Sequence, residues 1–315
     1  MKAILYDKSF SGALALREVE KPIPNDNDVL VKIHSVSVNA ADYRSIRMGI
    51  IPKRKIFGAD IAGSVEAVGN GVRQFVVGDE VFGDISSFGF GGFAEYVAAA
   101  EAALIKKPAG VTFETAAAVP MASVTALQAL RGIGKIKRGQ KALIVGAGGG
   151  VGTFAVQLAK HFGAEVTAVC GKGNAEMVRA LGADRVIDYT HKDFADSKDR
   201  YDLILAVNGH KPLSAYRRAL NPGGIVVVVG GAMSQVIKSM LLGPILSLGH
   251  RKIRLLAARP NKKDLEYVIK LVEDGIVRPV IDRRYALSET AEAVCYAGDG
   301  HAHGKVIINV VEGNN

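Results

Sequence analysis

Apolar positions along the chain follow two different patterns. From residue 1 to about residue 120, short strand-like runs such as VLVKIHSVSV and IAGSVEAVG are separated by Gly, Pro, Asn and Asp. Turn signals this frequent predict a mostly-β, barrel-like unit. From about residue 140, the apolar strands KALIVGA, AEVTAVC, RVIDY, YDLILAV and GIVVVVG mostly alternate with helical segments such as TFAVQLAKHFG. This alternation predicts a parallel sheet that is covered by helices on both faces.

The end of the chain returns to a shorter pattern. After residue 260 the segment DLEYVIKLVEDG predicts a helix and KVIINVV predicts a strand. The pattern alone leaves open whether these elements rejoin the first unit.

A cluster of glycines follows the first strand of the alternating region. The stretch LIVGAGGGVGTF, residues 143–154, matches the dinucleotide-binding fingerprint G-x-G-x-x-G at Ala147, Gly149 and Gly152. The turn is completed by Gly146, Gly148, Gly150 and Val151. Small residues let backbone N–H groups approach a pyrophosphate at the start of a helix. Because a strand precedes the cluster and a helix follows, we predict a dinucleotide site rather than a plain tight turn.

The end of the next strand indicates which dinucleotide is bound. An Asp or Glu there would bind the ribose 2′-hydroxyl of NAD, but the loop reads Cys170-Gly171-Lys172-Gly173-Asn174. Lys172 supplies positive charge for a 2′-phosphate, so NADPH is favoured over NADH. Gly171 and Asn174 are predicted to line the same site. The alternative is that Lys172 is a solvated loop residue.

Composition excludes several classes of protein. The chain has 315 residues, of which 49% are hydrophobic, and this excludes a disordered protein. Two cysteines exclude a disulfide framework, and the short apolar run at the start predicts neither a signal peptide nor a membrane span. We therefore expect a soluble cytoplasmic protein. The net charge of +9 is spread over short clusters, which fits solvated faces and an anionic cofactor; nucleic-acid binding is an alternative that no motif supports.

Several motifs in order resemble a known family. The segments VPMASVTALQAL, GAGGGVGTFAVQLAKHFGA, LGADRVIDYT and GHAHGKVIINV are similar to those of the medium-chain dehydrogenase/reductase superfamily, in its zinc-independent NADPH:quinone oxidoreductase-like branch. The resemblance covers nearly the whole chain. It implies an α/β protein with a GroES-like, mostly-β catalytic domain (residues 1–121 and 261–315). A Rossmann NADP-binding domain with a doubly wound parallel sheet (residues 122–260) would lie between these segments, with cofactor and substrate in the cleft.

The resemblance also implies further cofactor contacts. It makes Lys172 and Tyr189 neighbours of the 2′-phosphate, and it puts Thr125 beside the nicotinamide. Lys305, in the C-terminal tail, would close the cleft over the cofactor. Asn208, Gly230 and Gly231 end the fourth and fifth strands, where the edge of the sheet meets a ligand. As alternatives, Tyr189 is a core residue, Thr125 an ordinary helix residue and Lys305 a surface charge.

The chain departs from the zinc enzymes of the superfamily. Those enzymes carry a cysteine in the segment that matches SVNAADY and a histidine in a G-H-E motif. Here the first segment offers Asn39 and Asp42, and the second reads Gly58-Ala59-Asp60. Without a clustered set of soft ligands, we predict that no zinc is bound. His301 and His303, two residues apart, are interpreted as loop or cleft residues.

The missing metal favours conjugated substrates. Hydride addition to a quinone or an α,β-unsaturated carbonyl gives a delocalised anion, which needs only hydrogen-bond donors and a proton source. The candidate catalytic residues are Asn39 and Tyr43, which would orient or donate to the acceptor oxygen, and Asp42, which would organise them. Alternatively, Asn-x-x-Asp is a helix-capping pattern, and solvent supplies the proton.

The sequence thus predicts an NADPH-dependent quinone or enone oxidoreductase that acts on a small hydrophobic substrate, with a homodimer as a possible assembly. The apolar segment MLLGPILSLG could wall the acceptor pocket or form a subunit contact. The alternatives are a zinc-free alcohol or carbonyl dehydrogenase and an NADPH-binding redox sensor.

Overall fold

The chain forms two compact units. The computed structural model describes residues 1–7, 14–231, 237, 239–241, 243, 247, 249–300 and 302–311. Unit 1 contains Met1–Ala122, Pro260–Gly275 and Pro279–Asn315, and unit 2 contains Ser123–Arg259 and Ile276–Arg278. The C-terminal elements therefore belong to the same unit as the N-terminal strands. The short segment Ile276–Arg278, which the sequence analysis grouped with the catalytic domain, lies in unit 2.

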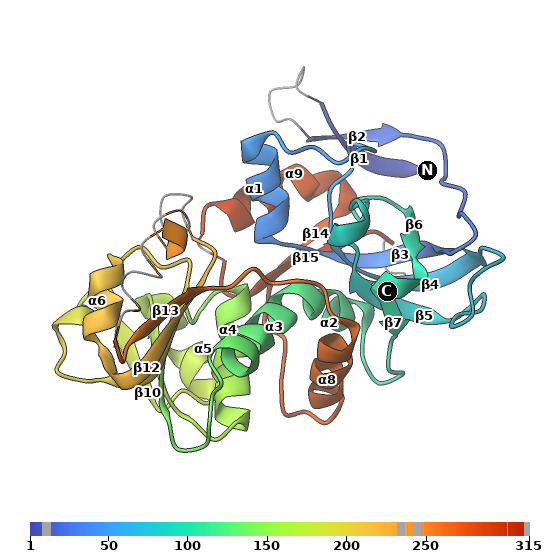
Figure 1. The fold of residues 1–315 in the computed structure, drawn as a ribbon. Helices are drawn as coiled ribbons and strands as arrows, with labels where there is room; N and C mark the ends of the chain where they lie inside the picture. The colour runs from blue at the N-terminus through green and yellow to red at the C-terminus, as the bar shows by residue number, and fades with distance from the viewer. Residues whose placement is uncertain are drawn as a thin grey trace. The chain divides into compact units, whose positions relative to one another are not determined.

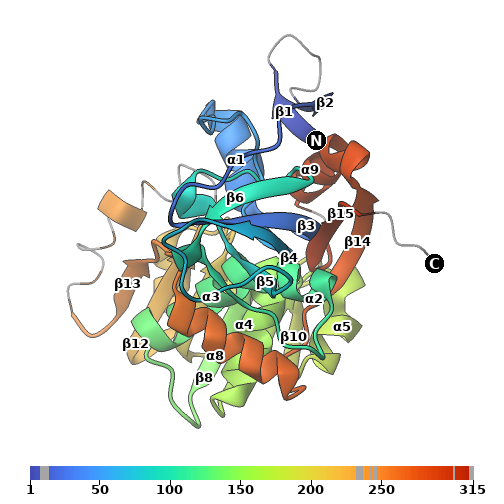
Figure 2. The same ribbon diagram turned by 90° about the vertical axis from the view of Figure 1, so that its right-hand side faces the viewer.

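Unit 1 is built around a seven-stranded sheet. Its strand order is β14-β15-β3-β4-β5-β7, and β6 pairs with β3 outside this path. The strands are β3 (Asp28–Val38), β4 (Asp60–Val68), β5 (Glu80–Asp84), β6 (Tyr96–Ala100), β7 (Leu104–Lys106), β14 (Ile281–Ala286) and β15 (Lys305–Asn309). β1 (Lys2–Tyr6) and β2 (Leu14–Glu18) form a separate antiparallel pair. Figure 2 shows the C-terminal β15 beside β3, to which it is antiparallel.

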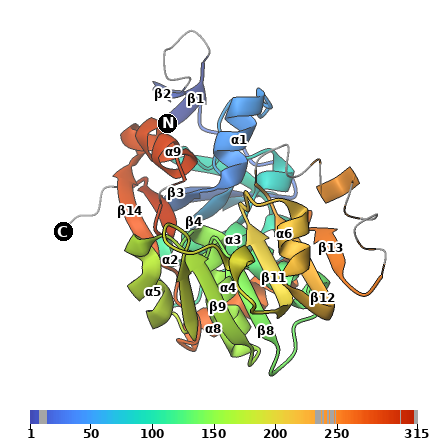
Figure 3. The ribbon, with the colours of Figure 1, turned by 90° about the vertical axis from the view of Figure 1, so that its left-hand side faces the viewer.

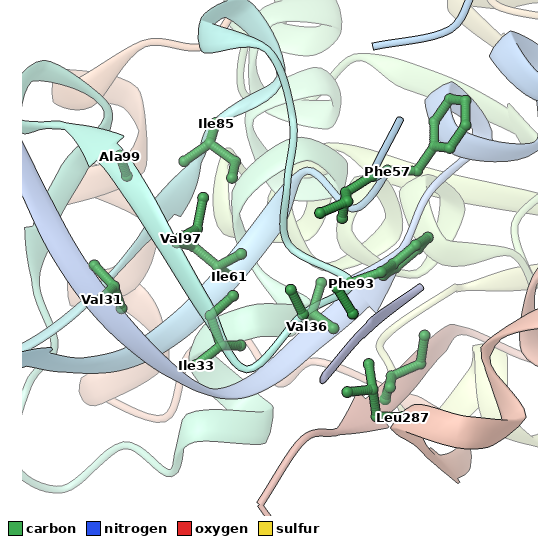
Figure 4. Close-up of a cluster of buried hydrophobic side chains, with 14 of the residues drawn as sticks. Val31, Ile33, Val36, Phe57, Ile61, Ile85, Phe93, Val97, Ala99 and Leu287 are labelled. Atoms are coloured by element: carbon green, nitrogen blue, oxygen red, sulfur yellow. The ribbon is translucent and has the colours of Figure 1, made fainter. Parts of the chain in front are cut away.

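Short helices accompany this sheet. The α-helices of unit 1 are α1 (Ala40–Met48), α2 (Phe113–Ala118), α8 (Lys262–Glu273) and α9 (Thr290–Gly298), and the 3-10 helices are η1 (Ser86–Phe88), η2 (Glu101–Ala103) and η6 (Leu287–Glu289). α2 packs on β3 and β4, and α9 packs on α1 and β15. The core between these elements is apolar: Phe57, Ile61 and Phe93 are fully buried (Figure 4).

Unit 2 is a parallel sheet with the order β10-β9-β8-β11-β12-β13. Its strands are β8 (Lys141–Val145), β9 (Glu165–Cys170), β10 (Arg185–Asp188), β11 (Tyr201–Val207), β12 (Leu220–Val229) and β13 (Lys252–Leu255). The direction of winding reverses between β8 and β11, so right-handed crossovers put the helices after these strands on opposite faces. The middle strands are buried on both faces, which explains their uninterrupted apolar runs.

Helices surround this sheet in Figures 1 and 3. They are α3 (Pro120–Leu127), a π-helix (Gln128–Ile133), α4 (Gly150–His161), η4 (Lys172–Asn174), α5 (Ala175–Ala180), η5 (Phe194–Asp196) and α6 (Leu213–Arg218). α4 packs on β8 and β9, whereas α6 packs on β12 and β13. The prediction of a mostly-β unit together with a doubly wound parallel sheet is confirmed. Within the described ranges, no helix is both long and apolar enough to cross a membrane.

Two phenylalanines of unit 1 test the assignment of its core. Phe93 is fully buried, whereas Phe88 is 52% exposed. We expect Phe93→Ala to lower the free energy of unfolding by about 3–5 kcal/mol, because it removes buried apolar surface and leaves a cavity. Phe88→Ala should change it by less than about 0.5 kcal/mol. Urea unfolding followed by circular dichroism measures both, and equal losses would contradict this core.

Candidate functional site

The glycine turn after β8 leaves no room for side chains at two positions. Gly146 has a φ of +78°, and a Cβ atom on it would lie 2.5 Å from the carbonyl oxygen of Val207, at the end of β11. A Cβ atom on Gly152 would lie 2.1 Å from the oxygen of Gly146. The turn therefore packs directly against the first turn of α4 and against the end of the neighbouring strand, which is the point where the winding of the sheet reverses.

The same turn is open at its centre. Gly149 is the N-cap of α4, and a Cβ atom on it would meet only the oxygen of Gly146, at 3.7 Å. The first turn of α4, which includes Gly150 and Val151, contains no acidic side chain. A glycine cap and a helix N-terminus without a carboxylate leave backbone N–H groups available to an anion. These residues fit the pyrophosphate of a dinucleotide.

The loop after β9 lies against this turn. The side chain of Asn174 is 2.5 Å from the place where a Cβ atom of Gly148 would stand. Lys172 is exposed, and the hydroxyl of Tyr189 lies 3.2 Å from the equivalent point on Gly171. Tyr189 itself is 65% exposed, so the alternative that it is a core residue is wrong. The ammonium-bearing side chain of Lys172, after β9, and the phenol of Tyr189, after β10, are therefore both exposed at this edge of the sheet.

An acidic residue at this edge was missed by the sequence analysis. Asp188 ends β10 and pairs in register with Cys170, the last residue of β9. Its carboxylate accepts hydrogen bonds from the backbone N–H (2.9 Å) and hydroxyl (2.8 Å) of Thr190. These bonds, with the nearby charges of His191 and Lys172, hold the pKa of Asp188 below its usual range. The signal in the sequence was an Asp directly before Tyr189, at a strand end.

The ends of β11 and β12 lie at the same edge of the sheet. Val207 and Val229 are paired, and the residues that follow have positive φ angles: +50° at Asn208, +61° at Gly230 and +112° at Gly231. A positive φ is uncommon for a residue other than glycine, although Asn tolerates it better than most. Asn208 is exposed there, and its backbone N–H donates to the Val229 carbonyl (3.2 Å).

Thr125 lies on α3 and is 7% exposed. Its predicted place beside the nicotinamide stays a prediction. The other cofactor candidates, apart from Lys305, lie in the glycine turn or at the carboxyl ends of β9, β10, β11 and β12. Unit 2 therefore gathers residues from distant parts of the sequence at one sheet edge.

In unit 1, Asn39 belongs to a buried polar cluster. Its Oδ1 accepts a hydrogen bond from Lys305 Nζ (2.5 Å). Its Nδ2 donates to Asp60 Oδ2 (2.8 Å) and to the carbonyl oxygen of Ser37 (3.3 Å). Both amide hydrogens are thus engaged within the protein. Asp60 is fully buried and Lys305 is 3% exposed, so the alternative that Lys305 is a surface charge is wrong.

Asp42 fixes the start of α1. One of its carboxylate oxygens accepts the backbone N–H of Asn39 (2.8 Å) and the other accepts the backbone N–H of Gly58 (3.0 Å). The helix-capping alternative therefore describes Asp42, which reaches back to the N-cap residue. The side chain of Asn39 is instead turned into the polar cluster.

Tyr43 is the third candidate catalytic residue, and it lies one residue farther along α1. A Cβ atom on Gly298 of α9 would lie 3.5 Å from Tyr43 Cγ, and the Arg47 guanidinium is 5.5 Å from the tyrosine ring centre. Helix α9 thus packs beside this ring. The structure brings Asn39 and Asp42 into direct contact and places Tyr43 at the junction of α1 and α9.

Burial shifts the titration of the polar cluster. It raises the pKa of Asp42 to about 7 and that of Asp60 to about 8, and it lowers the pKa of Lys305. The positive charge of Lys305 acts against the shift at Asp60. Asp84, which pairs with Asp60 across β4 and β5, also has a raised pKa because of its burial. These carboxylates therefore exchange protons closer to neutral pH than exposed ones do.

The two segments that carry zinc ligands in the zinc enzymes do not fit a metal ion here. Asn39 lies in the first segment and Asp60 in the second. The ammonium of Lys305 lies between them, bonded to Asn39 Oδ1 and 3.8 Å from Asp60 Oδ2. A divalent cation at this point would be repelled by that ammonium. In the part of the chain that the structure describes, no group of three His, Cys, Asp or Glu residues could hold a metal.

Two further predictions concern the C-terminal half of the chain. The backbone N–H of His303 donates to Asp282 Oδ2 (2.8 Å), whereas His301 lies outside the described residues. The apolar segment MLLGPILSLG is described only in part, and residues 242, 244–246 and 248 lie outside the described ranges.

Comparisons with known proteins agree with this architecture. Residues 25–109 match the family model described as an alcohol dehydrogenase GroES-like domain, and residues 181–308 match the one described as a zinc-binding dehydrogenase. The chain is 36% identical to the chloroplast envelope quinone oxidoreductase homolog of Arabidopsis thaliana, over 98% of both chains. It is 31% identical to the NADPH-dependent alkenal/one oxidoreductase of the same plant, over 98% of this chain and 79% of the relative.

Solved structures give the same result. The quinone oxidoreductase from Coxiella burnetii matches with a TM-score of 0.87 and 29% identity, over 99% of both chains. The resemblance drawn from the sequence motifs is confirmed, including the GroES-like character of unit 1. The chain belongs to the medium-chain dehydrogenase/reductase superfamily, in its quinone oxidoreductase-like branch.

Proposed function

We propose that this protein is an NADPH-dependent oxidoreductase that transfers hydride to a quinone or an α,β-unsaturated carbonyl without a metal ion. The observation that carries the proposal is the glycine turn, which is closed at Gly146 and Gly152 but open at Gly149, at the N-terminus of α4. Such a turn at the switch point of a doubly wound sheet is suited to a nicotinamide dinucleotide. The names of the relatives support quinones and conjugated carbonyls as acceptors.

The loop after β9 supports NADPH rather than NADH. Lys172 is exposed there, and Tyr189, which follows β10, lies against Gly171 of that loop. An ammonium and a phenol can both donate to a 2′-phosphate. The carboxylate of Asp188 already accepts two hydrogen bonds from Thr190. We therefore propose that it does not bind the ribose 2′-hydroxyl that an NAD-specific enzyme would recognise.

A metal-free reaction fits the polar cluster of unit 1. The bound cofactor supplies the hydride, and a conjugated acceptor spreads the resulting negative charge, so a Lewis acid is not required. Because both amide hydrogens of Asn39 are engaged, we propose that Asn39 orients its surroundings rather than donating to the acceptor. Asp42 organises the start of α1, and the hydroxyl of Tyr43 is the proposed donor, with solvent as the alternative proton source.

The alternatives differ in their reaction rather than in their fold. A zinc-free alcohol or carbonyl dehydrogenase would use the same nucleotide turn, and an NADPH-binding sensor would use it without turnover. Cytoplasmic localisation and the possible homodimer stay predictions, and the relatives named above include chloroplast proteins.

The first prediction concerns the acceptor. We expect metal-stripped protein to oxidise NADPH, followed by absorbance, with a quinone and a 2-alkenal but not with a simple ketone, because only conjugated acceptors form a delocalised anion. NADH serves as the cofactor control. Turnover with the ketone alone would favour a carbonyl dehydrogenase, and NADPH binding without any turnover would favour a sensor.

The second prediction concerns the 2′-phosphate. Lys172→Ala should raise the Kd for NADPH at least about tenfold, because a charge-assisted hydrogen bond contributes about 1.5–3 kcal/mol, and it should leave the Kd for NADH nearly unchanged. Lys198→Ala, which removes another exposed lysine of unit 2, is the matched control. Isothermal titration calorimetry measures all three proteins. Equal losses for the two cofactors in Lys172→Ala would remove the assignment.

The third prediction separates the fold of the glycine turn from its ligand. At Gly149 a methyl group makes only ordinary contact within the protein, so Gly149→Ala should keep the Tm within a few degrees but weaken NADPH and NADH binding alike. Gly152→Ala should lower both the Tm and the affinity, because its methyl group meets the backbone. Differential scanning fluorimetry with and without cofactor measures both effects. Normal binding by Gly149→Ala would place the pyrophosphate elsewhere.

A further inference from the structure

Lys305 is the first residue of β15, and three oxygen atoms lie within 4 Å of its ammonium. They are Asn39 Oδ1 at 2.5 Å, the Val38 carbonyl oxygen at 3.4 Å and Asp60 Oδ2 at 3.8 Å. The first two contacts are hydrogen bonds, and the third is an ion pair at a longer distance. With only 3% of the residue exposed, Lys305 is directed into the protein.

The three oxygens belong to two segments of unit 1 that are both far from Lys305 in the sequence. Val38 ends β3 and Asn39 begins the turn into α1, whereas Asp60 is the first residue of β4. Asp60 is itself held by Asn39 Nδ2 and by the backbone N–H of Met121 (3.1 Å). The ammonium therefore fastens the junction between β3 and α1 to the start of β4.

We propose that Lys305 is a positioning residue for the reduction: its ammonium holds the Asn39 side chain and the Asp60 carboxylate, and thereby fixes the β3–α1 junction that carries Asn39, Asp42 and Tyr43. This inference rests on the proposed function. It differs from the role as a cofactor contact that the family resemblance implied for Lys305. In the zinc enzymes of the superfamily the two matching segments carry zinc ligands. Here the ammonium of Lys305 is the cation that lies between these segments.

The charges around the cluster show why the ammonium matters. The carboxyl groups that face it come from α1 (Asp42), β4 (Asp60) and β5 (Asp84), and all three influence its titration. Lys305 is the one cation acting on Asp60 among the influences that shift it. Without the ammonium, the Asp60 carboxylate would be buried with no opposite charge beside it, which is strongly unfavourable. The pKa of Asp60, which burial already raises to about 8, would then rise further, so Asp60 would keep its proton up to a higher pH and accept fewer hydrogen bonds.

A second buried lysine of unit 1 provides a matched control. The Lys107 side chain is 4% exposed and forms an ion pair with Glu80 (2.8 Å). Its ammonium also donates to the carbonyl oxygens of Pro108 and Val111. Lys305→Met and Lys107→Met each remove one buried ammonium and keep an unbranched apolar chain, but only the first touches the β3–α1 junction.

The experiment compares steady-state kinetics of the full-length wild type and both variants with NADPH and a quinone, together with their Tm. We expect Lys305→Met to lower kcat at least about tenfold while the KM for NADPH stays within about twofold, because the nucleotide turn folds from residues of unit 2. The acid-side fall of its kcat should also move to higher pH, since the charge of Lys305 lowers the pKa of Asp60. Lys107→Met should lose thermal stability but keep the wild-type kcat and pH profile.

Each contrary result has a distinct meaning. A Lys305→Met enzyme with normal kcat and pH profile would make the cluster purely structural and overturn the proposal. A large rise in the KM for NADPH with unchanged kcat would make Lys305 a cofactor contact and overturn it as well. A wild type without turnover on any acceptor would overturn the proposed function and this inference with it.

A second variant decides the matter if Lys305→Met does not fold. Asp60→Asn keeps the shape of the side chain but removes the charge that faces the ammonium. We expect the same loss of kcat with little change in the KM for NADPH, and an unchanged kcat would overturn the proposal. Where both variants fold, the double variant should lose no more activity than the worse single one, because the two side chains act through one network.

Discussion

A charge that is buried in unit 1 must be paired with an opposite charge, and this requirement constrains how the C-terminal strand β15 pairs with β3. β15 is antiparallel to β3, with Val306 opposite Val38, so the residue before Val306 reaches the residue after Val38. That register puts the Lys305 ammonium on Asn39 and near Asp60, none of which is more than 7% exposed. A slip of one residue would turn the lysine to the other face of the sheet and leave the carboxylate alone. The register and the ion pair therefore support each other.

The two units differ in how much the sequence reveals. In unit 2 the glycine turn can be recognised from one continuous stretch of sequence: an apolar strand, a run of glycines and a helix. The backbone contacts of Gly146 and Gly152 explain why the local pattern has glycine at these two positions. Asp188 was missed because its position beside the loop after β9 depends on its pairing with Cys170. The pairing between two strands cannot be read from the sequence of one strand alone. The positive φ of Asn208 likewise depends on its tertiary surroundings.

Unit 1 was predictable as a class but not in its chemistry. Frequent turn residues indicated its mostly-β character, and the motif around Asn39 lies in the segment that contributes to the buried polar cluster. Asn39 was expected to orient the acceptor oxygen or to donate to it, and the structure engages both of its amide hydrogens with Asp60 and the Ser37 carbonyl. Lys305 is more than 260 residues away along the chain and was expected near the cofactor. Long-range ion pairs of this kind have no local pattern, because they depend on which strands become neighbours.

The chemistry follows from the same ion pair. A metal ion can stabilise a localised alkoxide. The Lys305 ammonium instead donates to Asn39 Oδ1 and to the Val38 carbonyl oxygen and is paired with Asp60, so its hydrogen bonds and its charge are directed at groups of the protein. Its contribution is then to hold neighbouring groups rather than to polarise a carbonyl. A site organised in this way favours acceptors whose own conjugation disperses the charge left by hydride addition. The conjugated acceptors named in the relatives are those that need the least electrostatic help from the protein.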